Sequence, residues 1–220
     1  MQRLLTTLRI IMIENYTQIA DGHWHQIEPT GDIMKYDEKY MQYYTKMDDR
    51  MSRLRYNLLV DHLEPFKSIL DVGYGDGNFL QYCFNRFVTC FGTDISNYPL
   101  PEGINFVENA SDVEVDVITF FDSLEHRTES DLLPFLKSLK TKNIVVSLPW
   151  CHGAMGPEYF QTWKHRKPNE HFHHFDYIGL VNLLDNAGFR TVHVCNAEDE
   201  IRKPVNYLPN ILTVIAKKYE

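Results

Sequence analysis

Seven short apolar runs constrain the fold of this chain most strongly. They are rich in Val, Ile and Phe and are bounded by Gly, Asp or Pro, which is typical of strands buried on both faces. The runs lie at 68–72, 88–93, 104–107, 115–121, 143–147, 191–195 and 211–216. Helical or turn-rich segments separate several of them, including a predicted helix over 176–188. The pattern predicts a Rossmann-like, doubly wound α/β fold with a mainly parallel seven-stranded sheet.

The last two runs leave no room for a helix between them, so we expect an antiparallel pair at one edge of the sheet. Before the first run, apolar and aromatic residues recur at three- and four-residue steps between Tyr36 and Leu58. This spacing predicts one or two helices covering the sheet. With a predicted amphipathic helix over 4–13, it gives an N-terminal helical cap or lid over 1–64 and a core over 65–220, in one domain of 220 residues.

Composition excludes several functional classes. A net charge of -8 disfavours nucleic acid, because binding to phosphates depends on clustered Lys and Arg. The four cysteines show no CxxC spacing, and no signal-peptide pattern precedes them, so we expect a cytoplasmic protein. The apolar stretch 4–13 is shorter than the roughly 20 residues that a membrane span needs, so no span is expected.

A glycine-rich loop follows the first predicted strand directly. The segment 69–80 reads ILDVGYGDGNFL, and its glycines allow a tight turn and a close approach of a ligand to the main chain. Its spacing differs from the dinucleotide pattern GxGxxG. Asp71, at the strand end, can accept a hydrogen bond from a cationic amino group. Asp94 ends the next strand about 20 residues later, where an acidic residue typically reaches ribose hydroxyls.

These segments, together with VDVITFFDSLEHR at 115–127, resemble class I S-adenosylmethionine (SAM)-dependent methyltransferases, especially the group that includes the ubiquinone-biosynthesis O-methyltransferases. The resemblance implies SAM as cofactor and S-adenosylhomocysteine as product. It places Asp71, Gly73 and Gly75 at the methionine part, with Tyr74 and Gly77 in the same loop. It also places Asp94 at the ribose. The remaining implied contacts are Ile95, Asn109 and Ala110 at the adenine, and Phe121 and Asp122 near the sulfonium. The acidic residue usual in the adenine segment is not evident, and His126 is interpreted as structural.

The acceptor side is predicted from a long insert between 149 and 176, which follows the fifth strand. Long loops in compact domains are often functional. Tyr36 and Tyr40 from the N-terminal segment, with Trp150 and Tyr159 from the insert, are the predicted acceptor contacts. His152, His171 and His174 are candidate bases, because an imidazole titrates near neutral pH. A structural role remains the alternative for each of the three.

The cluster of His and Cys in the insert matches no closed zinc motif, so no metal is predicted. The sequence therefore predicts a SAM-dependent methyltransferase acting on a small molecule, with oxygen as the favoured acceptor atom. Two alternatives stay open, namely a SAM-binding protein without catalysis and a nucleotide- or NAD-binding enzyme of similar fold. Oligomeric state is not predicted.

Overall fold

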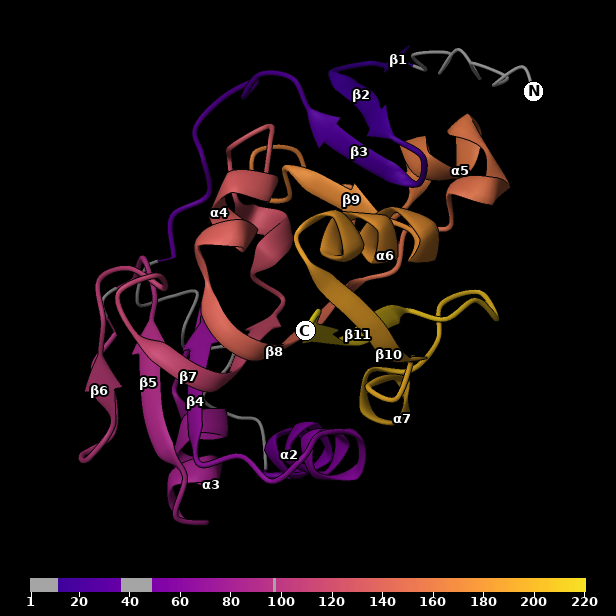
Figure 1. The fold of residues 1–220 in the computed structure, drawn as a ribbon. Helices are drawn as coiled ribbons and strands as arrows, with labels where there is room; N and C mark the ends of the chain where they lie inside the picture. The colour runs from indigo at the N-terminus through magenta and orange to yellow at the C-terminus, as the bar shows by residue number, and fades with distance from the viewer. Residues whose placement is uncertain (1–11, 37–48, 97) are drawn as a thin grey trace.

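A seven-stranded sheet with helices on both faces forms the larger part of the molecule (Figure 1). The computed structural model describes residues 12–36, 49–96 and 98–220. The strands of this sheet are β4 (Ser68–Val72), β5 (Thr89–Thr93), β6 (Asn105–Phe106), β7 (Glu114–Phe121), β8 (Lys140–Pro149), β10 (Phe189–Cys195) and β11 (Ile211–Lys218). Each corresponds to one predicted run, so the predicted seven-stranded sheet is confirmed.

The strand order is β10-β11-β8-β7-β4-β5-β6. Strand β11 alone runs opposite to its neighbours, because it pairs antiparallel with both β10 and β8. The predicted antiparallel edge pair is thereby confirmed. Strand β4 pairs in parallel with β5 on one side and with β7 on the other, so the order reverses at β4. Ligands of open α/β sheets bind outside the carboxyl ends of the strands at such a reversal.

Alternate residues of the central strands enter two separate cores. Ile69 and Val117 pack with helices α2 (Arg50–His62) and α3 (Asn78–Phe84) on one face. Leu70 and Ile118 pack on the other face, with α4 (Leu133–Ser138) and α6 (Tyr177–Asn186). The period of two follows from strand geometry, and burial of both faces explains why the runs are apolar throughout.

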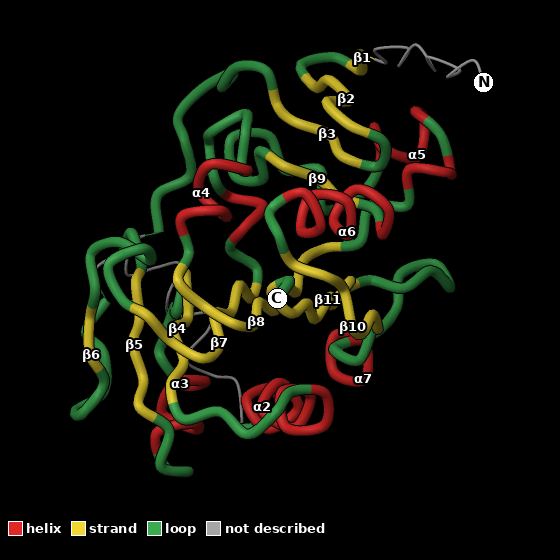
Figure 2. The backbone as a smooth tube through the Cα atoms, viewed as in Figure 1, coloured by secondary structure: helices red, strands yellow, loops and turns green. Residues whose placement is uncertain are grey.

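Helix α6 confirms the helix predicted over 176–188. It begins after Asp176, whose side chain accepts a hydrogen bond from the Gly179 backbone N–H at 3.0 Å. Gly188 follows its end with a φ of 95°, a conformation that favours glycine. The remaining helices are short: α5 (Pro157–Thr162), α7 (Asp199–Arg202) and two 3₁₀ turns, Leu124–His126 and Gly153–Met155 (Figure 2).

Part of the segment predicted as an N-terminal helical cap forms a second, smaller sheet instead. Strands β1 (Met12–Ile13), β2 (Tyr16–Ala20) and β3 (His23–Gln26) pair antiparallel with one another and with β9 (His173–Phe175). The reason is a hairpin at Asp21-Gly22, where Gly22 has a φ of 68°. The predicted helix over 4–13 falls on residues outside the described part, except for Met12 and Ile13, which are in β1. Helix α2 is the described part of the predicted cap that is helical.

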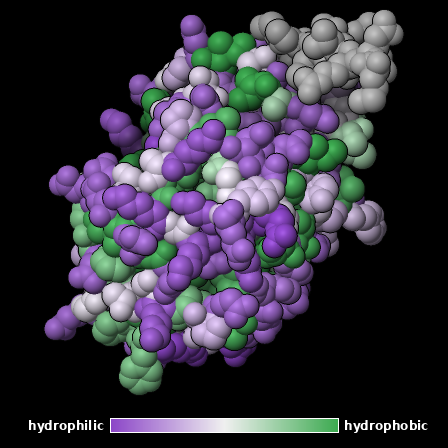
Figure 3. Space-filling view, in the orientation of Figure 1, coloured by the Kyte–Doolittle hydropathy of each residue, from purple (hydrophilic) through white to green (hydrophobic). Residues whose placement is uncertain are grey.

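The small sheet lies beside one end of the large one, with the indigo strands β2 and β3 next to the orange β9 (Figure 1). On the face drawn in Figure 3, hydrophilic residues are interspersed with hydrophobic ones. In the described ranges, no helix has the length and hydropathy that crossing a bilayer requires.

Candidate active site

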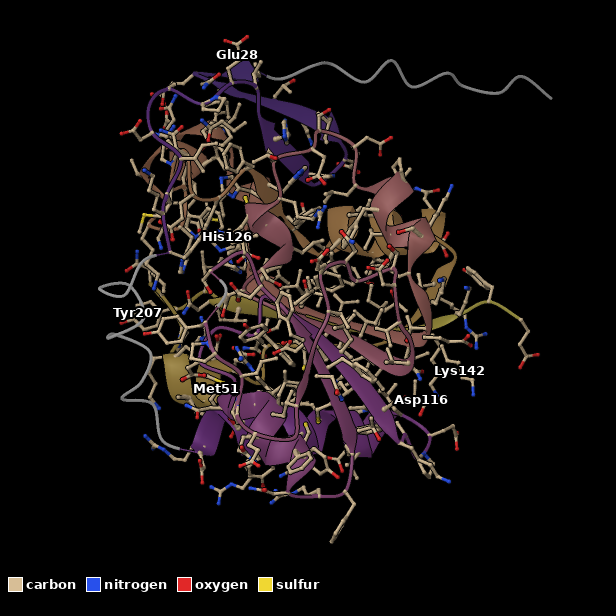
Figure 4. The ribbon with its side chains drawn as sticks, turned by 90° about the vertical axis from the view of Figure 1, so that its left-hand side faces the viewer. Glu28, Met51, Asp116, His126, Lys142 and Tyr207 are labelled. Atoms are coloured by element: carbon tan, nitrogen blue, oxygen red, sulfur yellow. The ribbon has the colours of Figure 1, made fainter. Side chains whose placement is uncertain are left out.

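A cavity of about 950 Å³ opens at the carboxyl ends of β4, β5 and β7. Residues just after each of these strands line it, and so do parts of α2 and of the segment before β9. Figure 4 shows His126 and Met51, which both line the cavity, at one side of the molecule, with Asp116 and Lys142 on the opposite side. Asp116 lies near the start of β7 and His126 follows its end, so the cavity occupies the position expected at the strand-order reversal.

The glycine loop after β4 forms one wall of the cavity. Gly73 and Gly75 have φ values of 81° and 56°, which glycine adopts without steric cost. A Cβ on Gly73 would lie 2.5 Å from the Ser123 Cβ, so this glycine is required for packing. A Cβ on Gly75 would meet no described atom within 4 Å. Because Gly75 also lines the cavity, its missing side chain leaves space that a ligand can occupy.

Asp71 is buried at the end of β4 and lines the cavity. The Thr119 hydroxyl donates a hydrogen bond of 2.6 Å to its Oδ1. Burial raises the pKa of Asp71 to about 7, because this hydrogen bond and the Arg55 guanidinium only partly offset the loss of hydration. A cationic group bound in the cavity would favour the charged carboxylate.

Asp94 follows β5, and its carboxylate connects the turn after this strand to the glycine loop. Its Oδ2 accepts a hydrogen bond of 3.0 Å from the Gly75 N–H, and its Oδ1 accepts one of 2.8 Å from the Ser96 N–H. Ile95, beside it, lines the cavity but is 82 % exposed. An exposed apolar side chain at a cavity edge can cover the face of a flat ring.

An ion-pair network lies at the base of the cavity. Arg202 pairs with Asp122, and Arg55 lies 3.5 Å from the same carboxylate. Both arginines also pair with Glu198, which is fully buried. Burial alone would raise the pKa of Asp122, but the charges of Arg202 and Arg55 outweigh it and hold that pKa below its usual value. Arg55, Glu198 and Arg202 were not among the predicted site residues, because they come from distant segments without a shared motif.

The structure brings the predicted cofactor contacts together, except for one. Gly77 does not line the cavity; it turns the chain into α3, with a φ of 72°. The residues that do line the cavity are Asp71, Gly73, Tyr74, Gly75, Asp94, Ile95, Asn109, Ala110, Phe121 and Asp122. Their contacts with a bound cofactor stay predictions. Glu108, which was not among them, also lines the cavity beside the predicted adenine segment.

The predicted acceptor contacts do not come together. Tyr36 lines the cavity, whereas Tyr40 lies outside the described residues. Trp150 stacks on His152 at 5.3 Å, and Tyr159 packs beside a separate cluster under the small sheet. Neither Trp150 nor Tyr159 lines the cavity. The part of the insert that carries Trp150 and Tyr159 thus lies away from the cavity, whereas Asn169, Glu170 and Phe172, later in the same insert, line it.

None of the three candidate bases lines the cavity either. His152 is held by the Pro209 carbonyl, with 2.7 Å between its Nε2 and that oxygen. His171 and His174 are buried, and this burial lowers the pKa of His171 well below its ordinary value and that of His174 to about 3. None of the three imidazoles faces this cavity, so their role as bases stays a prediction that the geometry does not support.

His126 is the histidine that lines the cavity among the described residues. Its Nδ1 lies 2.5 Å from the Tyr36 hydroxyl and 2.8 Å from the Glu170 carbonyl oxygen. Burial lowers the pKa of His126, so the imidazole is neutral near pH 7. The sequence led us to interpret His126 as structural, because its access to the cavity depends on Tyr36 and Glu170, which lie far from it in the chain.

The chain is similar in sequence to one known protein family. A family model described as a methyltransferase domain matches residues 39–194, more than half of the chain. The chain belongs to this methyltransferase family. The predicted family is thereby confirmed, whereas the narrower resemblance to the ubiquinone-biosynthesis group stays a prediction. No curated protein sequence matches the chain significantly.

Solved structures share the fold of this methyltransferase. One is a 1,6-didemethyltoxoflavin-N1-methyltransferase from Burkholderia thailandensis with its acceptor and S-adenosylhomocysteine bound; it is 16% identical, with a TM-score of 0.55, covering 94% of this chain and 100% of that one. A SAM-dependent methyltransferase from Archaeoglobus fulgidus is 20% identical, with a TM-score of 0.56, covering 83% and 100%. Human N-acetylserotonin methyltransferase with SAM is 17% identical, with a TM-score of 0.59, covering 83% and 55%.

Proposed function

We propose that this methyltransferase transfers the methyl group of SAM to a hydroxyl oxygen of a small molecule. One observation carries the proposal: the glycine loop, Asp71, Asp94 and the Tyr36–His126 pair all line the same cavity. A methyl donor and an acceptor in one enclosed space are what an in-line displacement needs, because positioning supplies much of its rate.

The loop side of the cavity suits SAM. Asp71 can accept a hydrogen bond from the amino group of the methionine part, and Asp94 can accept from ribose hydroxyls. Gly75 leaves room for the methionine chain, and Ile95 can cover the adenine. Among the described residues, seven carboxylates and three arginines line the cavity, an excess of negative charge that favours a sulfonium cation.

Other residues of the cavity lining suit a small, partly aromatic acceptor. Tyr36 and Phe172 contribute apolar surface there, and His126 contributes a neutral imidazole. The volume of about 950 Å³ lies at the upper end of ordinary ligand pockets, which leaves space beyond one cofactor. Arg55 and Arg202 are paired with Asp122 and Glu198, which argues against a polyphosphate acceptor. The B. thailandensis relative has a small molecule bound and is an N1-methyltransferase, so nitrogen is the competing acceptor atom.

The first test is calorimetric titration with S-adenosylhomocysteine. We expect micromolar binding that Asp94→Ala weakens by at least about 100-fold, because a charged hydrogen-bond acceptor is lost together with the support it gives Gly75. Asp61→Ala, at an exposed position of α2, is the matched control and should bind normally. A preference for NAD over S-adenosylhomocysteine, or equal binding by Asp94→Ala, would overturn the proposed cofactor site.

The second test identifies the acceptor atom. The purified protein is incubated with SAM and a panel of small phenols, alcohols and amines, and release of S-adenosylhomocysteine is followed by mass spectrometry. Methylated phenols or alcohols would support the proposal, and methylated amines alone would replace oxygen by nitrogen. Binding of SAM without any methylated product across the panel would favour the non-catalytic alternative.

A further inference from the structure

Glu125, His126 and His171 form a cluster at the wall of the cavity. Each offers one ligand atom, and these three atoms lie within 4.8 Å of one another. Glu125 and His126 belong to the 3₁₀ turn after β7, and His171 comes from the segment before β9. A backbone hydrogen bond of 2.8 Å, from the Phe172 N–H to the Glu125 carbonyl, joins the two segments. The cluster is therefore built on connected backbone.

The carboxyl group of Glu125 has no hydrogen-bond partner among the described residues, although Glu125 is only 2 % exposed. Buried polar groups in proteins nearly always have partners, and an unpartnered carboxylate is among the most costly to bury. Its Oε1 lies 3.8 Å from the His126 Nε2, which is too far for a hydrogen bond. A carboxyl group without a partner, close to two imidazoles, is the arrangement expected where a bound ion supplies the missing interaction.

Both histidines are oriented through the other ring nitrogen. His126 Nδ1 lies 2.8 Å from the Glu170 carbonyl oxygen, and His171 Nδ1 lies 2.9 Å from the His165 carbonyl oxygen. A proton donated to each carbonyl leaves the Nε2 lone pair of each ring available. This arrangement, in which the second nitrogen donates to a backbone carbonyl, is the usual one for histidines that bind metals. The Tyr36 hydroxyl, 2.5 Å from His126 Nδ1, fits the same tautomer by accepting from that nitrogen.

We propose that Glu125, His126 and His171 bind one divalent transition-metal ion, such as Zn²⁺. Two imidazoles and one carboxylate suit ions of this class, whereas Mg²⁺ and Ca²⁺ prefer oxygen ligands alone. Ligand atoms about 2.1 Å from one ion lie at most about 4.2 Å apart, so a small inward movement of the three side chains completes the site. No closed sequence motif reveals it, because the third ligand lies far along the chain from the first two.

The ion would lie at the acceptor side of the cavity, since His126 lines it. Three protein ligands leave coordination positions open, and an open position can hold an acceptor oxygen and favour its deprotonation. This role rests on the proposed function, whereas metal binding itself does not. The site can therefore be tested without SAM and without an acceptor.

The experiment measures metal binding directly. Protein stripped with a chelator is dialysed against micromolar Zn²⁺, and bound metal is counted by mass spectrometry; Co²⁺ binding is followed by its visible absorption. We expect one ion per chain, and at least about 100-fold weaker binding by Glu125→Gln, which removes a ligand charge with little change of shape. Circular dichroism checks that this variant is folded. The matched control is His193→Asn, because His193 stacks on His62 at 3.6 Å and this histidine pair could bind metal adventitiously.

The two variants distinguish the proposed site from adventitious metal binding. Loss of the ion in Glu125→Gln and its retention in His193→Asn support the proposal. No bound ion, an ion bound equally by Glu125→Gln, or an ion lost in His193→Asn would overturn it. If folding of Glu125→Gln is impaired, His171→Gln is measured instead with the same criteria. S-adenosylhomocysteine binding by the native protein, measured in parallel, shows separately whether the proposed function holds.

Discussion

The two sheets of this methyltransferase place buried ionisable groups of opposite kinds. The large sheet buries the Asp71 carboxyl, whose pKa burial raises to about 7. The small sheet buries imidazoles, and burial lowers the pKa of both His173 and His174 to about 3. The carboxyl group lines a cavity where a cationic ligand can pair with it, whereas the two histidines do not line that cavity. One buried group is therefore accessible to a ligand, whereas the other two lie in packed surroundings away from this cavity.

The largest expected effect comes from Asp71→Asn. Asparagine keeps an acceptor for the Thr119 hydroxyl but cannot be charged, so the native protein alone bears the cost of a buried carboxylate above about pH 7. The folded-state pKa is raised, so the native form binds more protons than the unfolded chain between about pH 4 and 7, and its stability falls as pH rises through that window. We expect Asp71→Asn without ligand to be more stable by about 4 kcal/mol at about pH 8, and nearly equally stable near about pH 4.

The same variant should bind S-adenosylhomocysteine about 10- to 100-fold more weakly, since a charged hydrogen bond is lost. Urea denaturation at several pH values and calorimetry measure the two effects. If Asp71→Asn were less stable than the native protein at high pH, burial of the Asp71 carboxylate would not be destabilising, and the stated difference between the two sheets would be wrong.

Substitutions of two glycines in the same loop distinguish a glycine needed for packing from one that leaves room for a ligand. Gly73→Ala places a Cβ 2.5 Å from the Ser123 Cβ at a φ of 81°, so we expect about 3 kcal/mol of destabilisation. Gly75→Ala has a φ of 56° and meets no described atom within 4 Å, so the backbone alone should cost about 1 kcal/mol. Its methyl group enters the cavity, and S-adenosylhomocysteine affinity should fall about tenfold. Thermal unfolding and calorimetry separate the two variants; equal stability of both would contradict the assignment.

His174→Phe tests how a buried imidazole of the small sheet affects stability. Its ring lies among the rings of Tyr16, Phe160 and Trp163, and its Nε2 has no hydrogen-bond partner among the described residues. A lowered folded-state pKa means that the unfolded chain binds the extra proton, so this contribution to stability is complete above about pH 6.5 and is lost as pH falls toward about 3. Between about pH 7 and 5 the native protein should therefore lose about 2 kcal/mol relative to His174→Phe.

Denaturation curves at the two pH values give this difference directly. Binding of S-adenosylhomocysteine by His174→Phe at neutral pH serves as the control and should be unchanged, because His174 does not line the cavity. Parallel pH dependence of the native protein and the variant would show that His174 is protonated in the folded state.

The smallest effect is expected for Tyr159→Phe. Tyr159 was a predicted acceptor contact, but its ring packs beside the cluster of Tyr16, Trp24 and Phe160 instead of lining the cavity. Removing the hydroxyl should change cofactor affinity and transfer rate by less than about twofold, the ordinary range for a substitution away from a site. A tenfold slower transfer would restore the sequence-based prediction for this residue.

Local patterns explain why most residues of the predicted cofactor site could be named from the sequence. Strand, glycine loop and helix follow one another within 68–84, and Asp94 comes at the end of the next strand. Parallel pairing of β4 with β5 and β7 then brings their carboxyl ends together without further information. The hairpin at Asp21-Gly22 also has a local sequence signal, because Asp-Gly between two short runs is typical of a two-residue turn. We did not predict it, because the N-terminal segment was interpreted as helical.

Local order along the chain is sufficient to predict the seven-stranded sheet, its antiparallel edge pair and the glycine loop, because each depends on neighbours in the chain. The surroundings of His126, where we propose that the acceptor binds, depend instead on contacts between distant segments. Pairing of β3 with β9 joins residues about 150 positions apart, buries His171 and His174, and leaves His126 at the cavity wall. The tertiary structure also sets His171 beside Glu125 and His126, which are neighbours in the chain. Such contacts depend on which distant strands pair, and no spacing within one segment encodes that choice.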